Sequence, residues 1–169
     1  MSDFRFKEIV DKIKDYYNED IIPLHRPTFK GNEASYVNDA IKSTFVSSVG
    51  SYVSEFELNF SKYTSINKSV ATVNGTSSLH IALILAGVQQ NDEVITQSLT
   101  FVATANAIKY VNAIPVFIDV DIENFGMNYE SLKNYLEKYA EIRNGISYNK
   151  ITGNRIKACL PMHTFGFPV

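Results

Sequence analysis

The chain has little cysteine and no long apolar run. Its 169 residues include one cysteine, Cys159, so no disulfide can form within the chain. Because Cys159 lies in an apolar run, we expect it to be buried as a packing residue. No segment has the length needed to span a bilayer, and the N-terminus lacks the basic start and apolar stretch of a signal peptide. We therefore expect a cytoplasmic protein without a membrane partner.

An excess of either charge is also missing. Lysine and arginine number 16 and aspartate and glutamate 18, which gives a net charge of −2. A nucleic-acid-binding protein normally carries a basic face, so no nucleic-acid partner is expected. The densest basic segment, residues 150–157, holds three basic residues and is interpreted as a solvated turn. With 45% hydrophobic residues, the chain is typical of a globular protein with one sizeable core.

Residues 1–68 are predicted to be a helical segment. Apolar residues at helical spacing mark a helix from Phe6 to about Asn18, and similar patterns mark helices over residues 34–45 and 53–63. Two prolines within residues 21–30 favour an extended connection.

From residue 69 onward, strand and helix patterns alternate. Predicted strands cover residues 70–73, 93–96, 114–120 and 155–160, and predicted helices cover residues 77–88, 102–110 and 132–139. This order predicts an α/β domain with a mainly parallel sheet and flanking helices. The helix over residues 77–88 is apolar nearly all round and is expected to be buried. Residues 141–155 are polar and are expected to form a surface excursion.

The last residues predict an incomplete domain. Residues 161–169 follow a strand but contain no helix to cover it. A parallel sheet needs both faces covered. We therefore expect residues 69–169 to be the first part of a truncated domain.

The first candidate site joins the strand at residues 70–73 to the apolar helix. Unpaired N–H groups and the positive dipole end of a helix N-terminus suit a phosphate. Gly75 would let a ligand approach the backbone, and Thr76 and Ser77 would add hydroxyl donors. An ordinary capped helix explains the same residues, and spacing alone leaves this alternative open.

The second candidate site is the segment around Phe101, just after the second long strand. Ligands of open parallel sheets bind outside the carboxyl ends of the strands, so Phe101 is expected to share a crevice with residues 75–77. There it could stack on a flat ring. The alternative is a core phenylalanine.

Other reactive residues carry weaker hypotheses. Asp119 and Asp121 share a strand face, but no further ligand type clusters with them, so no metal site is expected. His80 is expected to pack and His163 to be structural, and nothing in the sequence assigns a role to His25.

Several motifs, in order, resemble the DegT/StrS-type nucleotide-sugar aminotransferases, which are fold type I pyridoxal-phosphate enzymes. Residues 74–80 resemble the family's cofactor-phosphate motif, and residues 100–104 its ring-stacking segment. Residues 115–121 and 161–166 resemble two later strand motifs. Residues 22–33 and 47–57 resemble the opening of the family. The resemblance covers nearly the whole chain.

The resemblance implies roles for individual residues. Thr76 and Ser77 would hold the phosphate of pyridoxal 5′-phosphate, Gly75 would shape the turn, and Phe101 would stack on the pyridine ring. Residues 47–50, with Ser47, Ser48 and Gly50, would border the sugar-nucleotide site of the same or a partner subunit. The intact protein would be a homodimer.

The implied reaction moves an amino group from an amino acid, usually glutamate, to a keto-deoxysugar nucleotide, with C4 of a UDP-linked N-acetyl sugar as the favoured acceptor. The family's Schiff-base lysine and ring-nitrogen carboxylate follow the motif at residues 161–166, and no lysine here resembles the former. No catalytic residue is therefore assigned, and this chain alone is expected to be inactive. A sugar dehydratase of the same fold and a non-catalytic remnant remain as alternatives.

Overall fold

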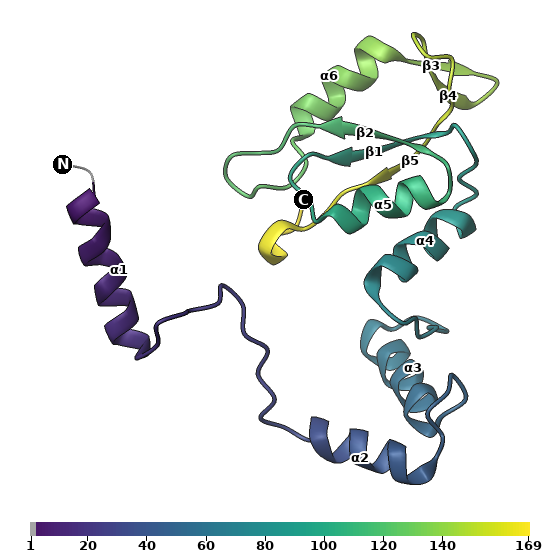
Figure 1. Cartoon of the computed structure of the whole chain (residues 1–169). Coiled ribbons are helices and arrows are strands. Elements are labelled where there is room, and N and C mark those ends of the chain that lie inside the picture. The colour runs from purple at the N-terminus through teal and green to yellow at the C-terminus, as the bar shows by residue number, and fades with distance from the viewer. Residues whose placement is uncertain (1–2) are drawn as a thin grey trace. The chain divides into compact units, whose positions relative to one another are not determined.

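A computed structural model describes residues 3–169 (Figure 1). The chain divides after Ser69 into two compact units, and each is described by itself. No helix within the described residues is both long and apolar enough to cross a membrane.

The first unit consists of three helices. They are α1 (Asp3–Tyr17), α2 (Glu33–Ser43) and α3 (Ser51–Thr64), which confirms the three predicted helices. The Tyr52 hydroxyl of α3 donates a hydrogen bond to Asp39 Oδ2 of α2 at 2.8 Å. The Tyr36 ring packs against the Tyr52 ring with 5.4 Å between centroids, so α2 and α3 are joined through aromatic and polar contacts.

The second unit is built on a three-stranded parallel sheet. Its strands are β1 (Glu93–Gln97), β2 (Ile114–Ile118) and β5 (Ile156–Leu160), in the order β2-β1-β5. Every residue of β1 is buried, as expected for a central strand covered on both faces. The helices are α4 (Gly75–Leu85), α5 (Val102–Tyr110) and α6 (Tyr129–Tyr139). The predicted α/β class with a parallel sheet is confirmed.

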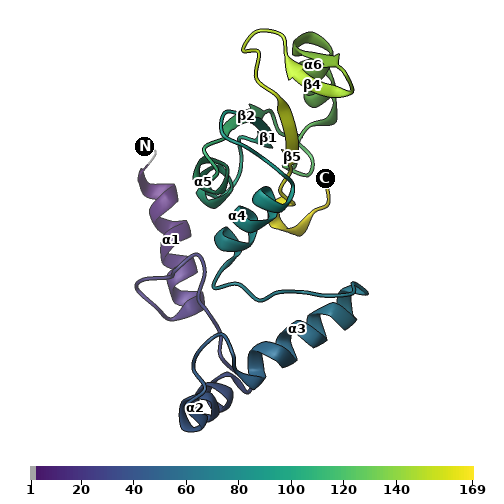
Figure 2. The same cartoon turned by 90° about the vertical axis from the view of Figure 1, so that its right-hand side faces the viewer.

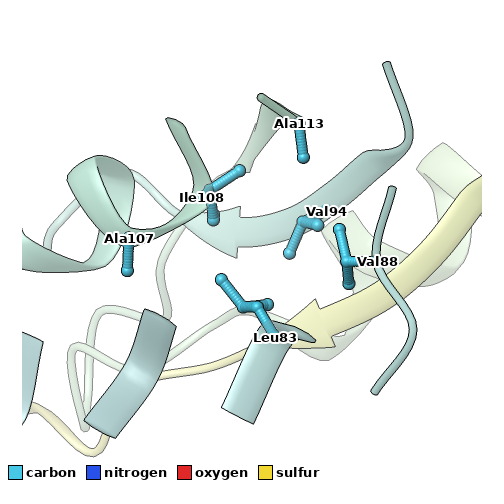
Figure 3. Close-up of a cluster of buried hydrophobic side chains, with 6 residues drawn as sticks. All are labelled: Leu83, Val88, Val94, Ala107, Ile108 and Ala113. Atoms are coloured by element: carbon cyan, nitrogen blue, oxygen red, sulfur yellow. The ribbon is translucent and has the colours of Figure 1, made fainter. Parts of the chain in front are cut away.

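Two apolar clusters hold the helices on the sheet. Helices α4 and α5 share one cluster, which is centred on Val94 and Ile108 (Figure 3). On the opposite face, Ile95 packs with Ile118 and Met127 beneath α6. In Figure 2, α6 lies on one side of the strands and α4 and α5 lie on the other. Adjacent residues of β1 therefore serve opposite layers, as the period of a strand requires.

The predicted strand over residues 70–73 is wrong. These residues are irregular in the structure, and Val70 and Val73 are 80% and 88% exposed. A strand needs a hydrogen-bonded neighbour, and no described strand pairs with this segment. The β-branched residues of this segment favour extended backbone, but they do not determine whether another strand lies beside it to pair with.

Two burial predictions are also wrong. Of the residues of α4, only Leu83 is buried, because the described residues pack this helix on one side and leave Ile84 and Leu85 exposed. Cys159 is exposed. Its neighbours Ala158 and Leu160 face the cluster below α4 and α5, so Cys159 points to the other face of β5, an edge strand among the described residues.

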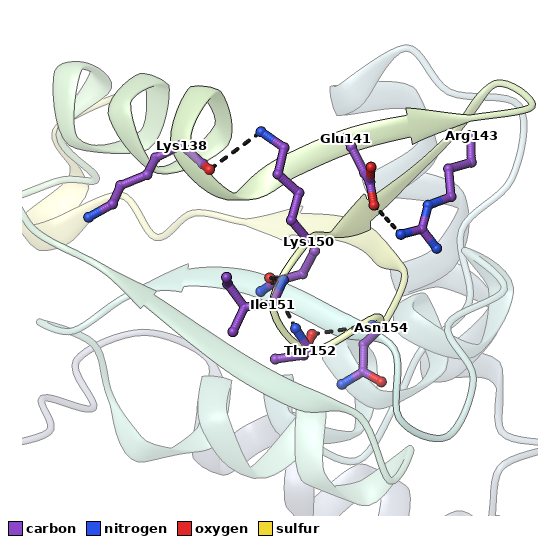
Figure 4. A network of polar contacts seen from close by, with 8 residues as sticks. Lys138, Glu141, Arg143, Lys150, Ile151, Thr152 and Asn154 are labelled. Carbon is purple, nitrogen blue, oxygen red and sulfur yellow. Dashed lines mark hydrogen bonds and ion pairs between the residues drawn. The ribbon is translucent and has the colours of Figure 1, made fainter.

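The segment predicted to be a surface excursion forms a short antiparallel hairpin. Its strands are β3 (Ala140–Arg143) and β4 (Ile146–Asn149). Just after β4, Lys150 Nζ donates to the Lys138 carbonyl of α6 at 3.4 Å and ties the hairpin to the end of that helix (Figure 4). Within β3, Arg143 pairs with Glu141. Asn149 is buried, so the surface prediction is wrong for this residue.

Candidate functional site

The turn at residues 74–78 starts helix α4 with a side-chain cap. Asn74 is extended, and its Oδ1 accepts a hydrogen bond from the Ser77 N–H at 2.9 Å. The Ser78 hydroxyl lies 2.5 Å from the Thr72 hydroxyl, so it is already engaged within the turn. The capped helix that sequence reasoning offered as an alternative is therefore present. The cap at Asn74 uses the Ser77 N–H and leaves Thr76 and the Ser77 hydroxyl for other partners.

Donors remain free on this turn. Within residues 3–169, the structure gives no hydrogen-bond partner to the N–H groups of Gly75 and Thr76, or to the hydroxyls of Thr76 and Ser77. A Cβ added at Gly75 would meet no atom within 4 Å. The packing of the chain therefore does not require glycine here, and the open space lets an outside group approach the backbone. Unpaired N–H groups at a helix amino end, with hydroxyls beside them, suit an anion.

Phe101 stands at the N-cap position of the neighbouring helix α5. Its φ and ψ are −65° and 141°, and its carbonyl accepts from the Thr104 N–H at 3.1 Å. The residue is 73% exposed, so the alternative of a core phenylalanine is wrong. An exposed aromatic ring at the start of a helix is free to stack on a planar group.

The topology places both candidate segments toward one edge of the sheet. β1 ends at Gln97 and α5 begins five residues later, so Phe101 lies at the carboxyl edge of the strands. Helix α4 leads from its carboxyl end to the amino end of β1, and its amino end points toward the same edge (Figure 1). Helices α4 and α5 share one core cluster. That Thr76, Ser77 and Phe101 line one pocket stays a prediction.

Sequence reasoning missed Gln97 at this edge. Its side chain is fully buried, and its amide Nε2 donates to the carbonyls of Leu99 and Phe125 at 3.0 and 3.2 Å. The same nitrogen donates to the Thr164 hydroxyl at 3.0 Å, and Oε1 accepts from the Met162 N–H at 3.0 Å. A polar residue that interrupts the apolar pattern of a central strand was the available signal.

The amino end of β1 carries a different polar network, which braces the hairpin. Glu93 is buried, and its carboxylate accepts from Thr152 Oγ1 at 2.6 Å and from Asn149 Nδ2 at 2.9 Å. Burial, together with the negative charge of Glu93, raises the pKa of Tyr135 to about 12. This network lies at the opposite end of the strand from Phe101, so it is structural.

An ion pair stands beside that network. Arg155 binds the nearly buried Asp92 through two hydrogen bonds, of 3.0 and 2.5 Å. Burial acts to raise the pKa of Asp92, but hydrogen bonds from Arg155 and from the Gln89 backbone outweigh it and hold the pKa below its usual value. The pair fastens the start of β1 to the start of β5.

The other candidates have structural contacts. The His80 ring lies edge-on to Tyr110 at 5.6 Å, in line with a packing role, and His163 Nδ1 accepts from the Val169 N–H at 3.0 Å. Asp119 and Asp121 accept hydrogen bonds from backbone N–H groups of their own turn. Within the described residues, no group of three potential ligands could hold a metal ion.

Gly50 lies in the first unit. It is buried at the start of α3, where a Cβ would come within 3.2 Å of the Phe45 carbonyl oxygen. Local packing therefore accounts for the glycine. A role of residues 47–50 at a sugar-nucleotide site stays a prediction.

In parallel α/β units, ligands bind at the carboxyl edge of the strands, and helix amino ends at that edge suit anionic groups such as phosphate. Residues 27–169 match the DegT/DnrJ/EryC1/StrS aminotransferase family. The chain belongs to this family. The family indicates pyridoxal phosphate as the cofactor, in agreement with the prediction.

Individual relatives agree with this assignment. The chain is 36% identical to GDP-perosamine synthase of Escherichia coli O157:H7 over 147 residues, which cover 87% of the chain and 36% of that protein. It is 37% identical over 117 residues to a Bacillus subtilis protein, EpsN, whose name describes a pyridoxal phosphate-dependent aminotransferase; the match covers 69% of the chain and 30% of that protein. The chain thus spans about a third of the length of the curated relatives it matches.

A solved structure extends the comparison to the fold. A DegT DnrJ EryC1 StrS aminotransferase from Brucella abortus superposes with a TM-score of 0.62 at 26% identity. The superposition covers 86% of the chain and 39% of that protein. The fold is that of the fold type I aminotransferases, as predicted.

The residues present fit pyridoxal phosphate. The free donors at Gly75, Thr76 and Ser77, with the open space beside Gly75, match a phosphate group. The exposed ring of Phe101 matches a flat heteroaromatic ring.

Proposed function

We propose that the protein carrying this chain transfers an amino group from an amino acid, glutamate in the first instance, to the keto carbon of a deoxysugar nucleotide. The observation that carries the proposal is the turn at residues 74–77. The cap at Asn74 takes only the Ser77 N–H and leaves the N–H groups of Gly75 and Thr76 and the hydroxyls of Thr76 and Ser77 free. The chain that carries this turn belongs to a family of aminotransferases. The similarity to GDP-perosamine synthase supports a nucleotide-linked sugar as the acceptor.

Each residue of the candidate site has a defined task. The N–H groups of Gly75 and Thr76 and the hydroxyls of Thr76 and Ser77 bind the cofactor phosphate, helped by the dipole of α4. Phe101 stacks on the pyridine ring and fixes its plane. When bound, pyridoxal phosphate supplies an electron sink for charge that develops on the amino-bearing carbon. Residues 47–50 border the sugar-nucleotide site of the same or a partner subunit, and the protein works as a homodimer.

The acceptor is the finer part of the proposal. We place the transferred amino group at C4 of the sugar. Resemblance of the opening segment and of residues 155–166 favours a UDP-linked N-acetyl sugar, whereas one relative is named for a GDP-linked sugar. Both nucleotides therefore belong in the assay.

The test is amination by the full-length protein. The purified protein is incubated with pyridoxal phosphate, glutamate and either a UDP-linked or a GDP-linked 4-keto-6-deoxysugar. Mass spectrometry then follows the amino sugar, and a coupled assay follows 2-oxoglutarate. Stoichiometric formation of both products supports the proposal, whereas loss of a sugar hydroxyl without a gain of nitrogen would indicate a dehydratase.

Two matched variants test the turn itself. Ser77→Ala removes a hydroxyl that is free in the structure, and Ser78→Ala removes one that the turn already uses. We expect the first variant to bind pyridoxal phosphate about tenfold more weakly, from the loss of one charge-assisted hydrogen bond. The second should retain its affinity; equal affinities of the two variants would argue against Ser77 as a phosphate ligand.

A further inference from the structure

Gln97 carries an unusual combination of position and chemistry. It is the last residue of the central strand β1, and none of its surface is exposed. A buried amide costs free energy unless its hydrogen bonds are made, and an apolar residue would satisfy the packing of a central strand without this requirement. The side chain therefore has a task other than filling space.

The amide of Gln97 joins three separate segments. Its Oε1 accepts from the Met162 N–H at 3.0 Å, and its Nε2 donates to the carbonyls of Leu99 and Phe125 and to the Thr164 hydroxyl. Only this orientation of the amide satisfies the network, since the flipped one would set an NH2 group against the Met162 N–H. Gln97 thus clamps the loop that follows β1 to the segment that follows β5.

A second contact links the same two segments. The Thr100 hydroxyl approaches Met162 Sδ at 3.3 Å and Thr104 Oγ1 at 2.8 Å. Thr100 immediately precedes Phe101, and Leu99 precedes Thr100. The backbone that carries the Phe101 ring is therefore held near Met162 by two contacts, one from Gln97 and one from Thr100.

Two residues at or next to the clamp have backbone in an uncommon conformation. Phe125 and Phe165 have φ of 59° and 53°, in the left-handed region that bulky residues avoid. The Phe125 carbonyl accepts from Gln97 Nε2 and also from the Thr164 hydroxyl, at 2.8 Å. Such conformations persist where surrounding contacts over-determine them, and they gather at functional sites.

We propose that Gln97 is a positioning residue: its amide fixes the loop of residues 98–101 against residues 162–164 and thereby sets the plane of the Phe101 ring over the cofactor. The inference rests on the proposed function, because it assigns the purpose of the clamp to cofactor binding. It concerns the orientation of the ring and leaves phosphate binding to residues 75–77.

The experiment compares the wild type with two variants, all at full length. Gln97→Met keeps the length of the side chain and removes all four hydrogen bonds. Thr96→Val is the matched control, because Thr96 is equally buried one residue earlier. Its hydroxyl makes one hydrogen bond, 2.8 Å to the Leu160 carbonyl, and does not reach the 98–101 loop. Thr164→Val removes only the two hydrogen bonds of the Thr164 hydroxyl in the same clamp. It replaces Gln97→Met if the Gln97 variant does not fold.

Three readouts separate ring position from stability. The visible circular dichroism of bound pyridoxal phosphate reports the orientation of its ring, fluorescence titration gives its dissociation constant, and thermal unfolding without cofactor gives stability. For Gln97→Met we expect loss of most of the dichroism and a dissociation constant raised about tenfold. Thr96→Val should lose thermal stability yet keep the dichroism and affinity of the wild type.

Other outcomes would overturn the inference. Unchanged dichroism in Gln97→Met would show that the clamp does not orient the ring. If Gln97→Met does not fold, unchanged dichroism in Thr164→Val would show the same. Equal losses in the Thr96 and Gln97 variants would reduce Gln97 to a stability role. If the wild type bound no pyridoxal phosphate, the proposed function would fall with it, whereas wild-type amination with unchanged variants would sink this inference alone.

Discussion

Replacing Asn74 by aspartate separates capping from phosphate binding at the start of α4. Asn74 Oδ1 accepts the Ser77 N–H at 2.9 Å, and an aspartate oxygen can take the same bond. Asparagine and aspartate are about equally good N-caps, and a negative charge at a helix amino end is favourable by roughly 0.3–1 kcal/mol. Asn74→Asp should therefore leave the helix as stable as before, or slightly more stable.

The same charge should repel the cofactor phosphate. Two like charges on the order of 5 Å apart, at an effective dielectric constant of about 20, repel by roughly 3 kcal/mol. That energy corresponds to about a hundredfold weaker binding of pyridoxal phosphate. Pyridoxal, which lacks the phosphate, should bind Asn74→Asp and the wild type equally well.

The assay is fluorescence titration of the full-length protein with both ligands, at low and high salt. Asn74→Ala is the companion variant: it loses the cap, at a cost of about 1 kcal/mol, and introduces no charge. We expect high salt to restore part of the affinity of Asn74→Asp, because ions screen exposed charges. Wild-type affinity for pyridoxal phosphate in Asn74→Asp would refute the placement of the phosphate at this turn.

Three further predictions concern the rest of the molecule. Arg155→Met should lower the free energy of unfolding by roughly 3 kcal/mol at pH 7, because it leaves the buried Asp92 carboxylate without its ion-pair partner. Since the pKa of Asp92 is lowered in the folded state, the pair contributes fully above about pH 4 and the contribution is lost as acid protonates Asp92. Urea unfolding of the wild type and the variant should therefore show a difference in stability that shrinks below that pH. The 169-residue chain, purified alone, should show no glutamate-dependent amination, and turnover above a cofactor-only control would contradict this. Light scattering on the full-length protein should show a dimer, and a monomer at working concentration would count against the homodimer.

The layers of the second unit could be predicted from the sequence because local patterns determined them. Strand and helix patterns in the sequence located β1, α5 and β5 to within a residue or two. Gly87, whose φ is 73°, lies two residues beyond the end of α4, where a glycine favours the end of a helix. These features depend on residues close together in the sequence, where propensity and pattern act together.

The predictions that were wrong depend on which other segments pack or pair with the residues concerned. Residues 70–73 have the composition of a strand, but pairing decides whether a strand forms. The apolar residues of α4 predicted burial on all sides, although burial depends on what else packs there. Motif resemblance selected Gly75, Thr76, Ser77 and Phe101, and the structure puts them at the amino ends of two neighbouring helices. Their cofactor-binding roles stay a prediction.

Strand β1 shows why the polar residues of the site escaped the pattern. Residues 93, 95 and 97 share one face, and of these only Ile95 belongs to the apolar cluster under α6. Glu93 and Gln97 occupy the two ends of that face, and each is fully buried. Apart from the Leu99 carbonyl beside Gln97, their side-chain partners are more than 25 residues away. Hydrophobic patterning predicts apolar residues at both positions of a buried strand, because the distant hydrogen-bond partners are not visible in the local sequence. A buried polar residue at the end of a central strand therefore identifies a place where distant segments meet. At the carboxyl edge, that place is the one at which parallel sheets bind their ligands.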